Sequence, residues 1–125
     1  MQRAARSLAR RFDEAFRPLG LTSGQFSLLM ALNRPEPPPM GPVANLLAMD
    51  RTTLTAALKP LERRGLVKIL QDPSDRRGRI LKLTNKSRSL LARAVPVWKR
   101  THDAVEQLIP DQAPGELRRS LQSLS

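Results

Sequence analysis

The feature that most constrains this chain is the stretch from Asp50 to Thr84, where an amphipathic segment is followed by two short apolar runs. Asp50 is a good N-cap because its carboxylate can accept a free N–H of the first turn, and Gly65 is a typical residue just past a helix end. At 100° per residue, four apolar side chains share one face of the segment between them: Leu54, Ala57, Leu58 and Leu61. We therefore predict a helix that packs this face against a core.

The opposite face of this helix is polar and basic, without bulky hydrophobic side chains. Its members are Thr52, Thr55, Ala56, Lys59 and Arg63, with Arg51 at its edge. Such a face can enter the major groove of duplex DNA, where a lysine can reach guanine and a threonine methyl can touch thymine. In the alternative interpretation, Thr52 and Thr53 only support the start of the helix.

The residues after Gly65 predict a β-hairpin. Val67 and Ile69 indicate a first strand, and residues 80–83 indicate a second. The sequence DPSDRRGR between them contains turn-forming residues. Three arginines lie at or beside the tip: Arg76, Arg77 and Arg79. A helix with a polar front followed by such a hairpin is typical of a winged helix-turn-helix fold, mainly α with a small β-hairpin.

The run LERRGLVKILQDPSDRRGRILKLT closely resembles the MarR family of bacterial transcription regulators. The family's wing has the form D-x-x-D-R-R followed by L-x-L-T, and seven residues match it: Asp72, Asp75, Arg76, Arg77, Leu81, Leu83 and Thr84. The resemblance implies a homodimeric repressor that binds a pseudo-palindromic DNA duplex and that a small-molecule effector can release. Two positions depart from the pattern, because many family members have arginine where Ala56 stands and often glycine where Ala48 stands.

Most of the excess positive charge lies on this predicted unit. The formal net charge is +11 over 125 residues, and residues 51–88 hold eleven Lys or Arg against three Asp or Glu. This concentration is typical of a polyanion site, so we expect double-stranded DNA as the partner. The alternative is a non-sequence-specific architectural DNA- or RNA-binding protein, which the basic charge would also suit.

Nine residues are candidates for the DNA site. On the helix they are Arg51, Thr52, Thr55, Lys59 and Arg63, and in the hairpin Arg76, Arg77 and Arg79, with Asp75 beside them. The hairpin arginines suit a narrow A·T-rich minor groove, whose concentrated negative potential attracts them. We expect Asp75 to orient a neighbouring arginine through a bidentate pair instead of facing DNA phosphates.

Other function classes find no support in the sequence. The chain has no cysteine, which excludes disulfides and thiol chemistry, and it has no catalytic constellation. We therefore expect no enzyme and no cofactor. His102 is the only histidine, so we expect a structural or surface role for it and no metal site. No apolar run approaches the ~18 residues that a membrane helix needs, which predicts a cytoplasmic protein without a membrane partner.

The segments at the two ends predict dimerisation helices. A helix over residues 2–17 carries an apolar stripe of Leu8, Phe12, Ala15 and Phe16. A long helix follows Thr84, and a last stripe comprises Leu117, Leu121 and Leu124. One winged domain cannot cover these stripes. We expect a single domain, 1–125, in which 1–20 and 85–125 form the dimer and 21–84 forms the DNA-binding lobe.

The segment between the first helix and Asp50 contains three further signals. Thr22 to Gln25 fits a capping box that starts a helix. The proline-rich run 34–39 cannot be helix interior. Pro42 suits the first position of a short helix that turns Val43, Leu46 and Leu47 inward. Later in the chain, Pro60 should bend its helix without breaking it.

Overall fold

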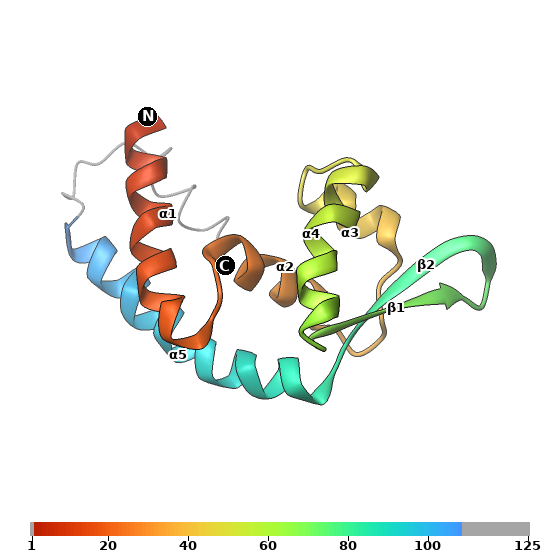
Figure 1. The fold of residues 1–125 in the computed structure, drawn as a ribbon. Helices are drawn as coiled ribbons and strands as arrows, with labels where there is room; N and C mark the ends of the chain where they lie inside the picture. The colour runs from red at the N-terminus through yellow and green to blue at the C-terminus, as the bar shows by residue number, and fades with distance from the viewer. Residues whose placement is uncertain (1, 109–125) are drawn as a thin grey trace. The chain divides into compact units, whose positions relative to one another are not determined.

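The computed structural model describes residues 2–108, and their side chains from Arg6 onward. The elements, in order, are α1 (Gln2–Phe16), the 3-10 turn η1 (Arg17–Leu19), α2 (Ser23–Leu32), α3 (Met40–Leu46), α4 (Arg51–Arg63), β1 (Val67–Asp72), β2 (Asp75–Leu83) and α5 (Asn85–Leu108) (Figure 1). The prediction of a mainly helical fold with one antiparallel hairpin is confirmed. The predicted stripe at Leu117, Leu121 and Leu124 lies outside the described residues.

The described chain divides into two compact units. One contains α1 and the part of α5 from Ala92 onward, and the other is Leu28–Leu91. The second unit holds α3, α4 and the hairpin, which are the elements of the predicted winged helix. None of the helices among residues 2–108 is long and apolar enough to cross a membrane. The assignment of the end helices to dimerisation stays a prediction.

The unit with the chain ends is built on aromatic side chains. Phe12 and Phe16 are buried on α1, and the Phe16 ring stacks on that of Phe26 with centroids 4.8 Å apart. Trp98 lies 6.4 Å from the Phe12 ring and stacks at 4.7 Å on His102. The single histidine is therefore a half-buried packing partner of Trp98.

The connection from α1 to α2 follows local rules that the sequence contains. Gly20 ends η1 with a φ of 70°, a conformation that glycine adopts without steric cost. The predicted capping box is present: the Gln25 N–H donates to Thr22 Oγ1, and the Thr22 N–H donates to Gln25 Oε1, both at 3.1 Å. The Ser23 N–H also donates to Asp13 Oδ1 at 2.6 Å, which ties α2 to α1.

The helix α3 begins earlier than predicted. Its N-cap is Pro39, so Pro42 is not the first helical residue. The inward face is Met40, Val43 and Ala44, whereas Leu46 is 59 % exposed and Leu47 half-buried. The prediction for Pro42 and for an inward Leu46 is therefore wrong. The reason lies in the preceding prolines: the Leu81 N–H donates to the Pro38 carbonyl at 2.9 Å, and Pro39 pairs with Ile80. This bridge to β2 sets where α3 starts.

The helix α4 is fixed at both ends and along its back. The Thr53 N–H donates to Asp50 Oδ1 at 2.6 Å, as predicted for an N-cap. Gly65 has a φ of 72°, and the bonds from the Gly65 N–H to Glu62 and from the Leu66 N–H to Leu61 close the C-terminal end. The buried back consists of Leu54, Leu58 and Leu61, each 0 % exposed. The helix continues unbroken through Pro60.

The hairpin is longer than predicted and joins directly to α5. Its register pairs Val67 with Leu83 at the base, and β2 extends back to Asp75. Thr84 caps α5, because the Ser87 N–H donates to Thr84 Oγ1 at 3.2 Å and the Thr84 N–H donates to Ser87 Oγ at 2.9 Å. The Thr84 hydroxyl also donates to the Gly65 carbonyl at 2.7 Å. This bond links the end of α4 to the end of the hairpin.

Candidate nucleic-acid interface

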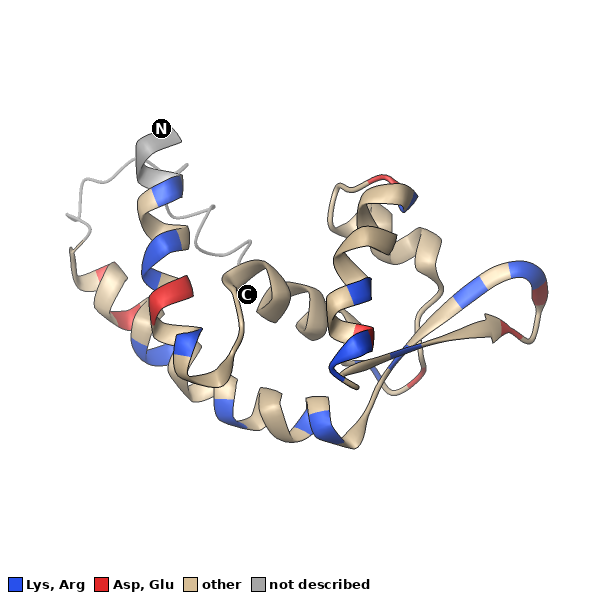
Figure 2. Ribbon diagram, in the orientation of Figure 1, with Lys and Arg blue, Asp and Glu red and all other residues tan. Residues whose placement is uncertain are grey.

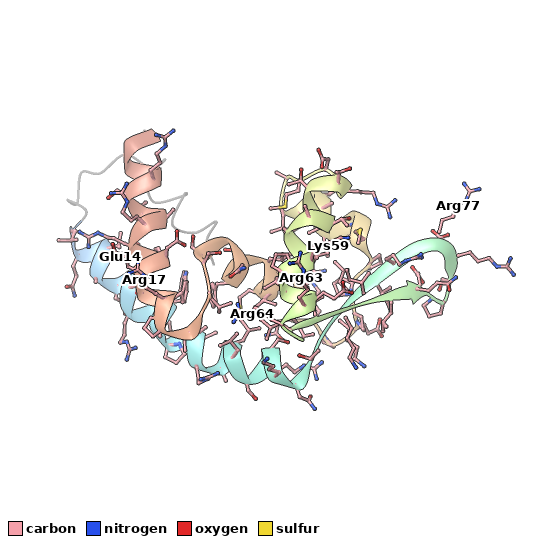
Figure 3. All side chains as sticks on the ribbon, in the orientation of Figure 1. Glu14, Arg17, Lys59, Arg63, Arg64 and Arg77 are labelled. Carbon is pink, nitrogen blue, oxygen red and sulfur yellow. The ribbon has the colours of Figure 1, made fainter. Side chains whose placement is uncertain are left out.

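The front of α4 is a ridge of exposed side chains opposite the buried leucines. Thr52, Ala56, Lys59 and Arg63 follow one another at helical spacing, and all four are exposed. Arg51 is exposed at the edge of the ridge. Figure 3 shows Lys59 and Arg63 projecting from α4. The ridge therefore carries two cations in its C-terminal half and small side chains before them.

Thr55 differs from the other predicted helix contacts, because it is half-buried and its hydroxyl is engaged. The hydroxyl donates to the Arg51 carbonyl one turn earlier at 2.7 Å. The Met40 sulfur lies 3.8 Å from the same oxygen. A hydroxyl has a single proton to donate, so Thr55 has none left for a base or a phosphate. Its methyl group remains the part able to make a new contact.

The N-terminus of α4 carries a fixed negative charge. The N–H of Thr53, and then its side chain, hydrogen-bond to Asp50 and lower the pKa of that carboxyl from its usual value of 3.8. The ionised carboxylate sits at the positive end of the helix, where an anion is stabilising. The idea that the first threonines support the helix start therefore holds for Thr53.

The wing, defined as β1, β2 and the turn between them, ends in a turn held by two aspartates. Asp72 Oδ1 accepts the Ser74 N–H at 2.8 Å, and Asp75 Oδ1 accepts the Arg77 N–H at 3.0 Å. A Cβ on Gly78 would lie 3.2 Å from Asp75 Oδ2 and 3.3 Å from Asp72 Cβ, so glycine lets these carboxylates approach the backbone. The contact of Asp75 is thus with a backbone N–H, whereas we predicted a pair with a guanidinium.

The arginines of the wing lie on β2 beside the turn. The register places Arg79 opposite Gln71 and Asp75 opposite Asp72, so Arg76 to Gly78 bulge out between these pairs. Arg79 Nη1 donates to the Gly78 carbonyl at 2.9 Å. Within the described part of the chain, none of the three guanidiniums forms an ion pair with a carboxylate. Figure 3 shows Arg77 pointing away from the end of the hairpin. The three arginine side chains are therefore exposed, and no carboxylate of the described residues neutralises their charge.

Both predicted groups of contacts belong to the unit Leu28–Leu91. Figure 2 shows Lys and Arg along α4 and near the end of the hairpin. All eight predicted cationic and threonine contacts lie on these two elements: Arg51, Thr52, Thr55, Lys59 and Arg63 on α4, and Arg76, Arg77 and Arg79 on β2. One helix and one hairpin thus present the basic surface that the charge pattern predicted.

Comparisons with known proteins match this architecture. The family model described as "MarR family" matches residues 21–78. The transcriptional regulator MosR of M. tuberculosis, in its complex with DNA, is 35% identical in sequence, with a TM-score of 0.82 over 98% of this chain and 88% of that one. The chain belongs to the MarR family.

Two further relatives are transcriptional repressors. The repressor CouR on a 23-mer DNA duplex is 34% identical, with a TM-score of 0.82 over 98% of this chain and 84% of that one, and CouR is also known bound to p-coumaroyl-CoA. The transcriptional repressor NicR of Pseudomonas putida is 36% identical over 76 residues, which are 61% of this chain and 48% of NicR. The chain spans about half the length of NicR and somewhat less of a second curated relative.

Sequence reasoning missed two features of this MarR-family site. Lys86 Nζ donates to the Arg64 carbonyl at 2.8 Å and so supports the C-terminal end of α4. Asp72 caps the turn of the wing through Ser74, a contact that the Asp-x-Ser spacing could have indicated. Neither residue was a candidate for the DNA site, because each bonds to a backbone group: Lys86 to the end of α4 and Asp72 to the turn of the wing.

Proposed function

We propose that this chain is a sequence-specific repressor that binds duplex DNA as a homodimer on a pseudo-palindromic operator. The observation that carries the proposal is the exposed ridge of α4 beside a wing whose arginines have no acidic partner within the described residues. DNA-bound MosR and CouR support it, because each matches nearly the whole chain.

In this proposal α4 is the recognition helix. Lys59 reaches guanine in the major groove, while Arg51 and Arg63 contact phosphates on either side. Thr52 lies near the start of the helix, where recognition helices make base contacts. Asp50 does not repel the phosphates strongly, because its charge is engaged by the first turn of α4.

The wing is the second contact. Arg76, Arg77 and Arg79 follow the backbone and enter the minor groove, where a narrow A·T tract strengthens the negative potential. Asp75 holds the backbone of Arg77 and in this way sets the direction from which its guanidinium leaves the turn. The wing thus supplies affinity for many sequences, and α4 supplies the choice among them.

Two copies are needed for the proposed operator. We propose that residues 1–20 and 85–125 form the dimer, with two recognition helices that meet half-sites about one DNA turn apart. Analytical ultracentrifugation at micromolar concentration should show a dimer, with and without DNA. A monomer under both conditions would contradict this assembly.

We also propose that a non-covalent small-molecule ligand releases the protein from DNA. A second proposal is that the protein acts in the cytoplasm, where the chromosome lies. CouR, which binds p-coumaroyl-CoA, supports the proposal of release by a ligand. The chain has no cysteine, so a thiol switch has no residue to act through. Loss of DNA binding after mild peroxide, with all four methionines unoxidised, would contradict ligand release as the only route.

The deciding experiment selects genomic fragments bound by the protein and then measures the affinity for the enriched duplex against random duplex. A specific regulator should prefer its operator by about 10³-fold or more at physiological salt. The alternative, a non-sequence-specific architectural DNA- or RNA-binding protein, would enrich no motif and bind both duplexes equally.

A further inference from the structure

The middle of the recognition ridge has no side-chain proton to donate. Between Thr52 and Lys59 the only hydroxyls are those of Thr53 and Thr55. The first contacts the Asp50 carboxylate and the second donates to the Arg51 carbonyl at 2.7 Å. Ala56 lies between Thr52 and Lys59 on the ridge, exposed, and its side chain is a single methyl group. This part of α4 can therefore read a base directly only through an apolar contact.

Apolar contact selects one base in the major groove. The base edges there present hydrogen-bond donors and acceptors, and the only apolar group among the four bases is the C5-methyl of thymine. Ala56 also has no long side chain that would hold the helix away from the groove floor. We infer that Ala56 reads the methyl group of a thymine, an inference that rests on the proposed DNA binding.

Lys59 fixes where this thymine stands. Ala56 and Lys59 are three residues apart, which is about 4.5 Å along a helix axis. Successive base pairs are about 3.4 Å apart, so the two side chains address neighbouring base pairs. With Lys59 on the O6 and N7 atoms of guanine, each half-site contains a thymine next to a guanine-containing pair.

The test replaces thymines of the selected operator one at a time by deoxyuridine, which lacks only the C5-methyl group. Affinities are measured by fluorescence anisotropy at constant salt. At one thymine per half-site, wild type should lose about fourfold in affinity, which corresponds to one buried methyl group. In the Ala56→Gly variant the same replacement should change affinity less than 1.5-fold.

Ala57→Gly is the matched control. It makes the same change one residue further on, at a half-buried position on the side of α4 turned from the ridge, with the same loss of helix propensity. This variant should keep the full fourfold effect of deoxyuridine. If Ala56→Gly unfolds by circular dichroism, Ala56→Arg replaces it, because arginine is a good helix former and its long side chain should also abolish the effect.

The position of the guanine is tested with 7-deazaguanine, which lacks the N7 acceptor. Next to the critical thymine, this base should weaken binding by wild type and leave the affinity of Lys59→Ala unchanged. The inference is overturned if no deoxyuridine changes wild-type affinity by more than 1.5-fold, or if the effect persists in both Ala56 variants. In either case operator preference over random duplex remains, so the proposed function stands. Loss of that preference itself would instead refute the proposed function.

Discussion

The recognition helix and the wing present cations on the same unit but are held in place by different means. The back of α4 is formed by Leu54, Leu58 and Leu61, all fully buried, and capping bonds fix both ends of the helix. The end of the wing is exposed and is held by carboxylate-to-backbone bonds within the turn itself. A side chain on α4 therefore starts from a backbone set by the core, whereas one on the wing starts from a locally held turn.

This difference teaches how the two elements divide the work. Discrimination among bases needs donors and methyl groups placed to within a fraction of an ångström, and a packed helix provides that placement. Attraction to phosphates tolerates looser placement, because it depends on charge and distance. We expect specificity to depend on the core beneath α4 and salt-dependent affinity to depend on the wing.

The largest expected effect comes from removing the support of α4. Leu58→Ala should lower the free energy of unfolding by about 2–5 kcal/mol, because a fully buried side chain leaves a cavity. The matched change in the wing, Leu70→Ala, should cost less than about 1 kcal/mol, since Leu70 is 41 % exposed. Urea denaturation measures both. Equal losses would show that the wing is packed as firmly as the helix.

The second prediction concerns base choice. Lys59→Ala should weaken operator binding by about 1–3 kcal/mol and relax the preference at particular base pairs. Arg34→Ala, which removes an exposed cation between α2 and α3, outside the proposed dimer and DNA contacts, is the control and should change neither. Affinities for single-base operator variants measure the effect. A uniform loss across all variants would place Lys59 on a phosphate instead of a base.

The third prediction concerns the wing. Arg77→Ala should reduce the slope of log affinity against log salt by about one unit, because one phosphate contact is lost. It should weaken binding to most sequences alike, and erase any preference for flanking A·T pairs if Arg77 enters the minor groove. Arg34→Ala, the same change at an exposed arginine outside the proposed dimer and DNA contacts, is the control. An unchanged salt slope together with an unchanged flank preference would remove the wing from the interface.

The same contrast explains what the sequence could predict. The cap at Asp50, the glycine end at Gly65 and the capping box at Thr22 are confirmed, because each depends on residues within one turn of one another. The buried leucines of α4 follow from helical spacing in the same way. Local chemistry was enough wherever the partner lies nearby in the chain.

Errors arose where the partner is distant or the geometry unusual. The start of α3 depends on the pairing of Pro39 with Ile80, forty-one residues further on, and no local pattern records that contact. With Met40 buried as the first residue of α3, the inward face runs through Met40, Val43 and Ala44, and this spacing leaves Leu46 exposed. At the wing, the charge on Asp75 suggested a guanidinium partner. The geometry of the turn instead places the Arg77 N–H within hydrogen-bond distance of the Asp75 carboxylate. The individual contacts to DNA stay predictions.

The fourth prediction concerns the turn that delivers α4. Ala48 has a φ of 54°, the only positive φ of a non-glycine residue in the described part of the chain. Ala48→Gly should raise the free energy of unfolding by about 1 kcal/mol, because this conformation is strained for an L-residue with a Cβ. Ala57→Gly, in the helix itself, should instead lower it by up to about 1 kcal/mol. Destabilisation by both variants in urea would show that the turn is not strained.

The smallest expected effect lies at the cap of α4 and depends on pH. The bonds from Thr53 lower the pKa of Asp50 below 3.8, so the ionised carboxyl contributes stability that is fully present above pH 3.8 and is lost as the pH falls through the lowered pKa. Asparagine caps a helix comparably but does not titrate in this range. The melting temperature of wild type should therefore exceed that of Asp50→Asn near pH 7, and the gap should close on acidification below pH 3.8.

Asp50→Ala is the control for this last experiment, because it removes the cap whatever the pH. Its melting temperature should lie below that of Asp50→Asn throughout, since an alanine side chain accepts no hydrogen bond from the Thr53 N–H. A constant gap between wild type and Asp50→Asn from pH 7 to pH 2 would mean that the charge contributes nothing at the helix end. The first turn of α4 would then be fixed by its packing and by the hydrogen bond from the Thr53 N–H, without a contribution from the charge of Asp50.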